Sequence, residues 1–463
     1  MPALLFAQAM KRVVVVGAGI SGLALAFELR RLGVPVVVLE SDLRAGGKIE
    51  SDHRDGYLCE RGPASYLDRS GSISALAKAL GIEDRVLWAG DAAERRLVAA
   101  DGRLHDTPRS AAEFAMSALL PWRAKLRVSL DLVLARGPSA RGQDESVATF
   151  ARRRLGAVAG ERLLQPLVSG LYAGDPEQVS LPSAFPLVAA MERDRRSFLL
   201  AMRRELAAAK RKDAPHLASF KNGLDELTSA LAAALGTDLR LRARVARMGC
   251  TSAGYEVALE EQRVTQTIEA DAVVLALPAH VACSLAASID AAVADTLAHI
   301  PYVPVTLVHL GYPAAAFVRP LDAYGFFVPP SESLRVLGGI FPSQFFQHRA
   351  PDGFHLLSVR TGGARHPEAF TMPDQDLVAL ADGEIRRLVG LSAPPSFVHI
   401  VRHERALPQY TLGHMDRLAA VEAGEQRHPG LFFHGNAYHN AGVPELVARS
   451  TKLAGRVAAF VKT

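Results

Sequence analysis

Residues 17–22 form a glycine-rich loop whose residue types suit a dinucleotide. Four valines precede this loop and a helical pattern follows it, so it joins a strand to a helix. Gly17 permits the tight turn, Gly19 lets a pyrophosphate approach the backbone, and Gly22 lets the helix pack closely on the strand. Glu40 ends the next strand, where its carboxylate can accept the ribose hydroxyls. The pattern predicts dinucleotide binding; the alternative is a structural turn with a coincidental acid.

The residues that follow Glu40 favour FAD over NAD. Arg44, Gly46 and Gly47 in the segment ESDLRAGGK resemble the ExxxRxGG signature of the flavoprotein superfamily of amine oxidases and porphyrinogen oxidases. Close to the other end of the chain, LFFHGNAYHNAGV is similar to the superfamily's last strand, turn and flavin loop. The resemblance implies one noncovalently bound FAD per chain.

Further segments are similar to those of the protoporphyrinogen oxidases. They are ERGP at 60–63, SGLYAGD at 169–175, DAVVLALP at 271–278, YGFFVP at 324–329 and PQYTLGH at 408–414, and the likeness runs in order from about residue 11 to the end. The resemblance implies an FAD-dependent, six-electron oxidation of protoporphyrinogen IX to protoporphyrin IX in haem biosynthesis. Dioxygen or another acceptor would reoxidise the flavin.

Three positions depart from that pattern. Ala64 stands where many relatives have Asn, and Arg360 stands at a position that is apolar in the protoporphyrinogen oxidases. Pro444, in the flavin loop, is more similar to the coproporphyrinogen oxidases, whose substrate has four propionates. Oxidation of coproporphyrinogen III therefore stays open as the alternative.

The motifs and the resemblance together assign residues to the cofactor and to the substrate. For FAD they are Gly17, Ala18, Gly19, Ile20, Ser21, Gly22, Glu40, Ser41, Arg44, Gly47, Lys48, Gly62, Pro63, Ala64, Ser65, Val245, His403, Ala441, Gly442 and Val443. For the porphyrinogen they are Arg96, which would pair with a propionate, the wall residues Leu171, Tyr324, Phe327 and Ile340, and Arg360. The backbone carbonyl of Gly170 is the catalytic group that the resemblance implies, because it would orient the macrocycle.

Arg360 allows two explanations. In the strand 355–361, side-chain alternation puts Leu356, Ser358 and Arg360 on one face, and this mixed polar face is expected to line the substrate pocket. Arg360 could pair with an extra propionate or with a protein acid, and we expect the acid.

The elements that hold these residues predict an α/β chain, α+β overall, in three units. A discontinuous Rossmann-type FAD domain spans 10–65, 216–285 and 401–463, and a sheet-based substrate domain spans 66–104 and 286–400. Residues 105–215 are rich in Ala, Leu and Arg at helical spacing and form a helical insertion.

The helical insertion is more basic than the rest of the chain. The chain's net charge is +5, and residues 105–214 carry 18 Lys and Arg against 12 Asp and Glu, a local excess of +6. An apolar cluster, Phe114, Met116, Leu119, Leu120, Pro121 and Trp122, precedes Arg123, Lys125 and Arg127, so this region could lie on an anionic membrane or close the active site. We expect no nucleic acid partner, and a homodimer is an open alternative.

Cysteine and histidine patterns point to neither a disulfide framework nor a metal. The three cysteines lie far apart, and His399 and His403 stand four apart in a segment that is predicted to be a strand. With no basic signal region at the N-terminus, a cytoplasmic location is expected, with peripheral attachment to the inner cell membrane as the alternative.

Two other functions compete with porphyrinogen oxidation. An amine oxidase of the same fold would need an aromatic cage beside the flavin, whereas the tail supplies only Tyr438 and no cysteine for a covalent flavin. A non-catalytic, FAD-stabilised membrane adaptor would explain the basic helices alone.

Overall fold

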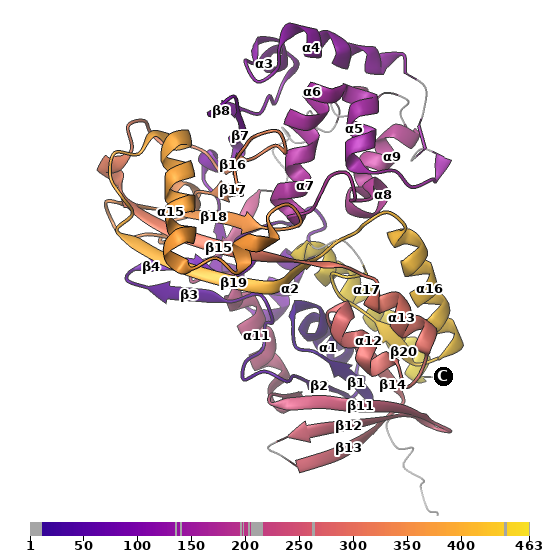
Figure 1. Cartoon of the computed structure of the whole chain (residues 1–463). Helices are drawn as coiled ribbons and strands as arrows, with labels where there is room; N and C mark the ends of the chain where they lie inside the picture. The colour runs from indigo at the N-terminus through magenta and orange to yellow at the C-terminus, as the bar shows by residue number, and fades with distance from the viewer. Residues whose placement is uncertain are drawn as a thin grey trace, which may run out of the picture.

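The computed structural model of the chain describes residues 12–134, 137–138, 141–194, 197, 199–201, 204, 216–261, 264–438 and 442–462. It divides into a nucleotide-binding unit, a large sheet and a helical unit. The helical unit lies at the end of the molecule opposite strands β11 to β13 (Figure 1).

A five-stranded parallel sheet forms the centre of the nucleotide-binding unit. Its strands, in spatial order, are β10 (Leu239–Arg240), β2 (Val36–Leu39), β1 (Val13–Val16), β14 (Ala272–Leu275) and β20 (Leu431–Phe433). The continuous apolar runs VVVV and AVVL are buried on both faces, as parallel strands require. This arrangement confirms the predicted Rossmann-type architecture.

Alternate side chains of β1 enter two separate cores. Val13 and Val15 pack with α1 (Ile20–Arg31), α11 (Asp225–Leu235) and α17 (Val443–Lys462). Val14 and Val16 pack on the other face with α12 (Ala279–Ala286), α13 (Ala291–Ala298) and an antiparallel sheet of β11 (Ala243–Thr251), β12 (Gly254–Glu261) and β13 (Val264–Ala270). Both faces of the central sheet are therefore covered.

A seven-stranded sheet forms the second unit. Its order is β19 (Phe397–Pro408), β15 (Tyr302–Pro313), β18 (Phe354–Gly362), β17 (Val336–Ile340), β16 (Gly325–Phe327), β7 (Arg96–Ala100) and β8 (Arg103–Asp106). Leu357 and Val359 of β18 share a core with α15 (Asp374–Ile385), which covers one face. The opposite face of β18 is thus left for the site.

The helical unit contains the predicted insertion. Its helices are α3 (Ala111–Met116), α4 (Trp122–Ser129), α5 (Val147–Leu155), α6 (Ala157–Ala159), α7 (Gln165–Tyr172), α8 (Leu181–Ala184) and α9 (Pro186–Asp194). A π-helical turn, Gly160–Leu164, joins α6 to α7 just before Pro166, whose missing N–H disfavours a regular turn. Such turns occur often at functional sites, and α7 carries Gly170 and Leu171.

The remaining elements are a hairpin, a small sheet and three helices, two of which pack in the cores of the nucleotide-binding unit. They are the hairpin β3 (Ser51–Arg54) and β4 (Tyr57–Glu60), the small sheet β5 (Tyr66–Leu67), β9 (Leu217–Phe220) and β6 (Val86–Trp88), and helices α2 (Ser72–Leu80), α14 (Pro342–Phe345) and α16 (His414–Arg427). The expected domain boundary between residues 400 and 401 falls inside β19. Because β19 pairs with β15 as far as Pro408, the whole strand belongs to the seven-stranded sheet.

Candidate functional site

The glycine loop between β1 and α1 leaves an opening at one glycine only. A Cβ on Gly17 would lie 2.6 Å from the Ala276 carbonyl oxygen, and one on Gly22 would lie 2.0 Å from the Gly17 carbonyl oxygen. A Cβ on Gly19 would meet nothing within 4 Å. Gly17 and Gly22 are thus required by the fold itself, whereas Gly19 borders free space at the positive end of a 12-residue helix that has no acid in its first turn. The loop fits a pyrophosphate.

The second glycine segment lies directly against the first. Gly46 forms an isolated bridge with Gly19, and its amide donates to the Ala18 carbonyl at 2.8 Å. A Cβ on Gly47 would lie 3.3 Å from the Gly19 Cα atom. The structure therefore brings together two motifs that the sequence separates by 24 residues or more, around the same opening.

Glu40 lines a cavity of about 280 Å³ beside this loop. One carboxylate oxygen accepts from the Ala18 amide at 2.7 Å and the other from the Asp42 amide at 2.9 Å, so the side chain is held in place. The lining includes Gly17, Ser41 and Val245, all expected at the cofactor. This cavity suits the nucleoside part of a dinucleotide.

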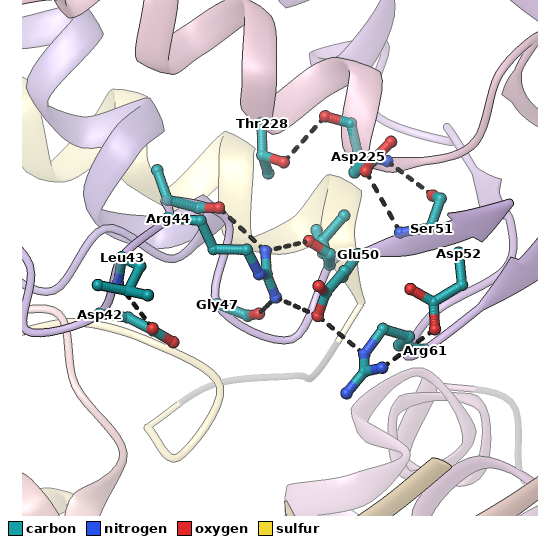
Figure 2. A network of polar contacts seen from close by, with 12 residues as sticks. Asp42, Leu43, Arg44, Gly47, Glu50, Ser51, Asp52, Arg61, Asp225 and Thr228 are labelled. Carbon is teal, nitrogen blue, oxygen red and sulfur yellow. Dashed lines mark hydrogen bonds and ion pairs between the residues drawn. The ribbon is translucent and has the colours of Figure 1, made fainter. Parts of the chain in front are cut away.

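Arg44 organises its own loop. Its guanidinium donates to the carbonyls of Ala45, Gly47 and Ile49 and forms an ion pair with Glu50 at 2.7 Å (Figure 2). Glu50 in turn pairs with Arg61. The structure therefore shows Arg44 holding the glycine pair, and direct contact of Arg44 with a pyrophosphate stays a prediction.

Lys48 and His403 tie the cofactor segments to β19. The Lys48 ammonium donates to the carbonyls of Arg405 and Ala406, and burial lowers the pKa of Lys48 to about 8. His403 Nε2 lies 2.6 Å from the Arg61 carbonyl oxygen, directly before the expected cofactor segment Gly62–Ser65. A Cβ on Gly62 would lie 2.1 Å from the Lys48 carbonyl oxygen, so only glycine allows the two segments to meet.

The remaining cofactor residues lie at helix starts. Ile20 and Ser21 are buried in the first turn of α1, and Val443 begins α17 in the same core. A Cβ on Gly442 would lie 2.1 Å from a Glu445 carboxylate oxygen. Ala441 lies outside the described residues.

A second cavity, of about 230 Å³, gathers most of the expected substrate residues. Gly170 and Leu171 come from α7, Tyr324, Phe327, Ile340 and Arg360 from the seven-stranded sheet, and Gly62, Pro63, Ala64 and Ser65 from the loop after β4. Three units of the molecule thus contribute to one largely apolar space with arginines in its wall. This is the cavity in which we predict that the macrocycle binds.

Arg96 and Arg95 are distinguished by their partners. Arg95 forms an ion pair with Asp106 at 2.6 Å. Arg96 is exposed, and its guanidinium lies 5.6 Å from the centre of the Tyr324 ring, which lines the cavity. Of the two arginines, Arg96 is therefore the one placed to receive a carboxylate.

Arg360 does not have the partner that we expected. Its guanidinium donates to the Gly170 carbonyl oxygen, and no carboxylate in the described part of the chain forms an ion pair with it. The expectation that a protein acid pairs with Arg360 is wrong for the described residues. The expected strand face is confirmed for Ser358 and Arg360, which line the cavity, whereas Leu356 packs in a separate cluster with Tyr57 and Phe397.

Three polar residues of this cavity were not predicted from the sequence. His309 is fully buried on β15, its Nδ1 lies 2.8 Å from Ser358 Oγ, and burial lowers its pKa to about 3. Glu60 is buried and its pKa is raised by burial to about 7, while Arg349 is buried beside it. Glu60 opens the ERGP segment, so the motif was recognised but this side chain was not assigned to the substrate site, whereas His309 on β15 and Arg349 in the loop after α14 belong to no motif.

Comparison with known proteins agrees with this geometry. The family model of flavin containing amine oxidoreductases matches residues 20–457. The chain is 31% identical to a chloroplastic protoporphyrinogen oxidase of Nicotiana tabacum, over 97% of this chain and 85% of that protein. It is 28% identical to the coproporphyrinogen III oxidase of Bacillus subtilis, over 94% and 96%.

The fold of the chain is also similar to that of a solved structure. A crystal structure from Exiguobacterium sp. 255-15, provisionally assigned as a protoporphyrinogen oxidase, superposes with a TM-score of 0.82 at 25% identity and covers 97% of this chain and 99% of that one. The glycine loops, the held carboxylate of Glu40 and a match over nearly the whole length agree: the chain belongs to the flavin containing amine oxidoreductase family.

Proposed function

We propose that this FAD-dependent oxidoreductase oxidises a porphyrinogen to a porphyrin in haem biosynthesis, with protoporphyrinogen IX and coproporphyrinogen III as its two candidate substrates. The observation that carries the proposal is the second cavity, which combines apolar walls, two arginines in its lining, Arg349 and Arg360, and a third, Arg96, at Tyr324. A porphyrinogen needs this combination because its macrocycle is apolar and its propionates are anionic.

The roles of the residues follow from their chemistry. Bound FAD accepts electron pairs as hydride and passes them to dioxygen or another acceptor. Tyr324, Phe327 and Ile340 exclude water from the macrocycle, and Arg96 pairs with a propionate. The Gly170 carbonyl orients the ring, and Phe327 lies so close that a Cβ on Gly170 would be 2.2 Å from its ring. This division of roles requires no protein acid or base.

The same cavity argues against an amine as substrate. Amine oxidation would place an ammonium group or its neutral form near the flavin, and the Arg360 guanidinium in the cavity wall would repel the cation. The solved cyclohexylamine oxidase of Brevibacterium oxydans is 19% identical to this chain, and this likeness supports a shared fold but not a shared substrate.

Side-by-side turnover of the two porphyrinogens tests the proposal. Flavin-loaded protein is mixed with each substrate, and porphyrin fluorescence is followed against a protein-free control for autoxidation. We expect flavin-dependent porphyrin formation from at least one substrate. Flavin-loaded protein that accelerates neither reaction would contradict the proposal and favour the non-catalytic adaptor.

We also propose that the outer face of the helical unit contacts an anionic membrane surface. None of the described helices is long and apolar enough to span a membrane. Figure 1 shows α3 and α4 at the outer end of the unit, where Met116 and Trp122 are 78% and 68% exposed. Leu119 and Leu120 of the expected apolar cluster are buried instead, because they pack in the core of the helical unit.

A further inference from the structure

Arg360 is a cation in the cavity wall without a counter-ion from the described chain. Among the described residues, Glu60 is the only one that brings a carboxylate to the cavity lining, and its two oxygens accept from Ser51 Oγ at 2.7 Å and from the Leu224 amide at 2.8 Å. Arg154, an arginine buried in the helical unit, shows the usual solution: it forms ion pairs with Asp131 and Glu192. Within the ranges that the structure describes, Arg360 has the Gly170 carbonyl oxygen as its hydrogen-bond partner and no carboxylate as an ion-pair partner.

Such an arrangement is costly unless an anion completes it. A guanidinium stays charged at all relevant pH values, and an unpaired charge in an apolar site is unfavourable. Burial accordingly lowers the pKa of Arg360. Because Arg360 lines the cavity, a ligand can reach the guanidinium directly.

The strand ladder separates Arg360 from Arg96. Gly325 of β16 pairs with Arg96 on one side and with Ile340 of β17 on the other, and Gly338 of β17 pairs with Arg360. Three strand spacings therefore lie between the two backbones, ~14 Å. The Arg96 guanidinium lies over the Tyr324 ring, and Tyr324 and Arg360 line the same cavity, so the two cations lie on either side of one aromatic wall.

We infer that Arg360 is a second carboxylate-binding residue of the substrate site, which selects a porphyrinogen that carries propionates at both ends. The inference rests on the proposed oxidation of a porphyrinogen. Protoporphyrinogen carries its propionates along one edge of the macrocycle, whereas coproporphyrinogen carries four propionates, at both ends. Only coproporphyrinogen can therefore place one carboxylate at Arg96 and another at Arg360 at the same time. Arg360 therefore favours coproporphyrinogen over protoporphyrinogen.

The hydrogen bond from Arg360 to Gly170 adds a consequence for turnover. Without a substrate carboxylate, the guanidinium occupies the carbonyl oxygen that would orient the macrocycle. A propionate that pairs with Arg360 draws the guanidinium away and leaves this oxygen to accept from a pyrrole N–H. The substrate carboxylate would thus raise kcat as well as lower KM.

The test compares four flavin-loaded proteins on both porphyrinogens: wild type, Arg360→Met, Arg360→Lys and Arg365→Met. Arg365 is a matched control, because its guanidinium also donates to a backbone carbonyl, that of Pro330, and it is absent from the lining of the cavity. Arg360→Met should lower kcat/KM for coproporphyrinogen III by at least about 30-fold, and it should leave that for protoporphyrinogen IX unchanged or raise it, because the Gly170 carbonyl is then free. Arg365→Met should leave the ratio of the two values unchanged.

Equal losses on both substrates, or no loss on either, would overturn the inference. If Arg360→Met does not fold, Arg360→Lys decides, because loss of the bidentate contact should still reduce kcat/KM for coproporphyrinogen selectively, by at least about fivefold. Affinity for the product coproporphyrin III, measured by fluorescence quenching, separates this inference from the proposed function. A wild type that turns over neither substrate contradicts the function, while equal affinity of wild type and Arg360→Met for coproporphyrin III contradicts the role of Arg360.

Discussion

Gly19 and Gly22 belong to the same turn but serve different ends. Gly22 has no room for a side chain, because the Gly17 carbonyl lies 2.0 Å from the place of its Cβ, whereas Gly19 borders open space. Gly22 is thus required for folding, and Gly19 is required for cofactor binding. The distinction makes flavin binding testable apart from stability.

We expect Gly19→Val to fold and to lose FAD, because the new side chain occupies the space that the pyrophosphate needs. Flavin absorbance per chain should fall by at least about tenfold while far-ultraviolet circular dichroism stays that of wild type. Gly22→Val, the matched variant, should fail to fold. Full flavin occupancy in folded Gly19→Val would refute the assignment of this loop.

At the scale of elements, α4 combines an inner and an outer face. Ala124 and Val128 are buried, whereas Trp122, Leu126 and Leu130 recur every four residues and are 68%, 62% and 49% exposed. The Arg127 guanidinium points inward to the carbonyls of Arg153 and Arg154. The surface available to a membrane is therefore this outer stripe with Met116, so Met116 and Trp122 of the predicted cluster are exposed, whereas its Leu119 and Leu120 are buried.

Substitution of this stripe should weaken membrane binding without unfolding the protein. Trp122→Gln with Leu126→Gln is expected to reduce flotation with anionic liposomes by at least about fivefold, since both side chains lose apolar contact. Trp88→Gln with Val318→Gln, which are 56% and 73% exposed outside the helical unit, form the control. Flotation that changes equally in both double variants, or in neither, would count against a specific membrane face.

At the scale of the whole molecule, a line of polar groups joins the large sheet to the nucleotide-binding unit. His309 of β15 stacks on His399 of β19 with ring centres 5.8 Å apart, and His399 Nε2 lies 2.7 Å from Asp52 of the β3–β4 hairpin. Asp52 also pairs with Arg61. Burial of His309 lowers its pKa to about 3, with His399 and Arg61 adding to the effect and Asp52 opposing it.

This buried histidine predicts a loss of stability in acid. The unfolded state binds a proton near pH 6.5 and the folded state only near pH 3, so the contribution of His309 is present above pH 6.5 and is lost as the pH falls toward 3. Between pH 7 and pH 5 the wild type should lose about 2 kcal/mol of unfolding free energy relative to His309→Gln. Urea titrations of both flavin-loaded proteins measure the difference. An equal pH dependence in the two proteins would show that His309 is not kept neutral by the fold.

Local sequence determined the nucleotide-binding half of this protein. The valine runs, the glycine spacing and Glu40 lie within 30 residues, and short-range sterics and strand periodicity suffice to predict a βαβ unit with an anion-binding turn. Alternation along β18 likewise placed Ser358 and Arg360 on one face before any partner was known. The domain boundary at β19 was missed, because strand pairing over about 100 residues leaves no local signal.

The partners and the burial of the charged side chains could be determined only from the tertiary structure. The sequence contains enough acidic residues to supply a partner for Arg360. In the folded chain, however, the Glu60 carboxylate accepts from Ser51 and Leu224, and the Arg360 guanidinium donates to the Gly170 carbonyl. His309 and Arg349 join the cavity from a strand and a loop far apart in the sequence, so no spacing predicts them, and the ERGP segment did not show that the Glu60 side chain reaches the same cavity. The free energy of a charge depends on its burial and its partners, and both are properties of contacts between distant segments.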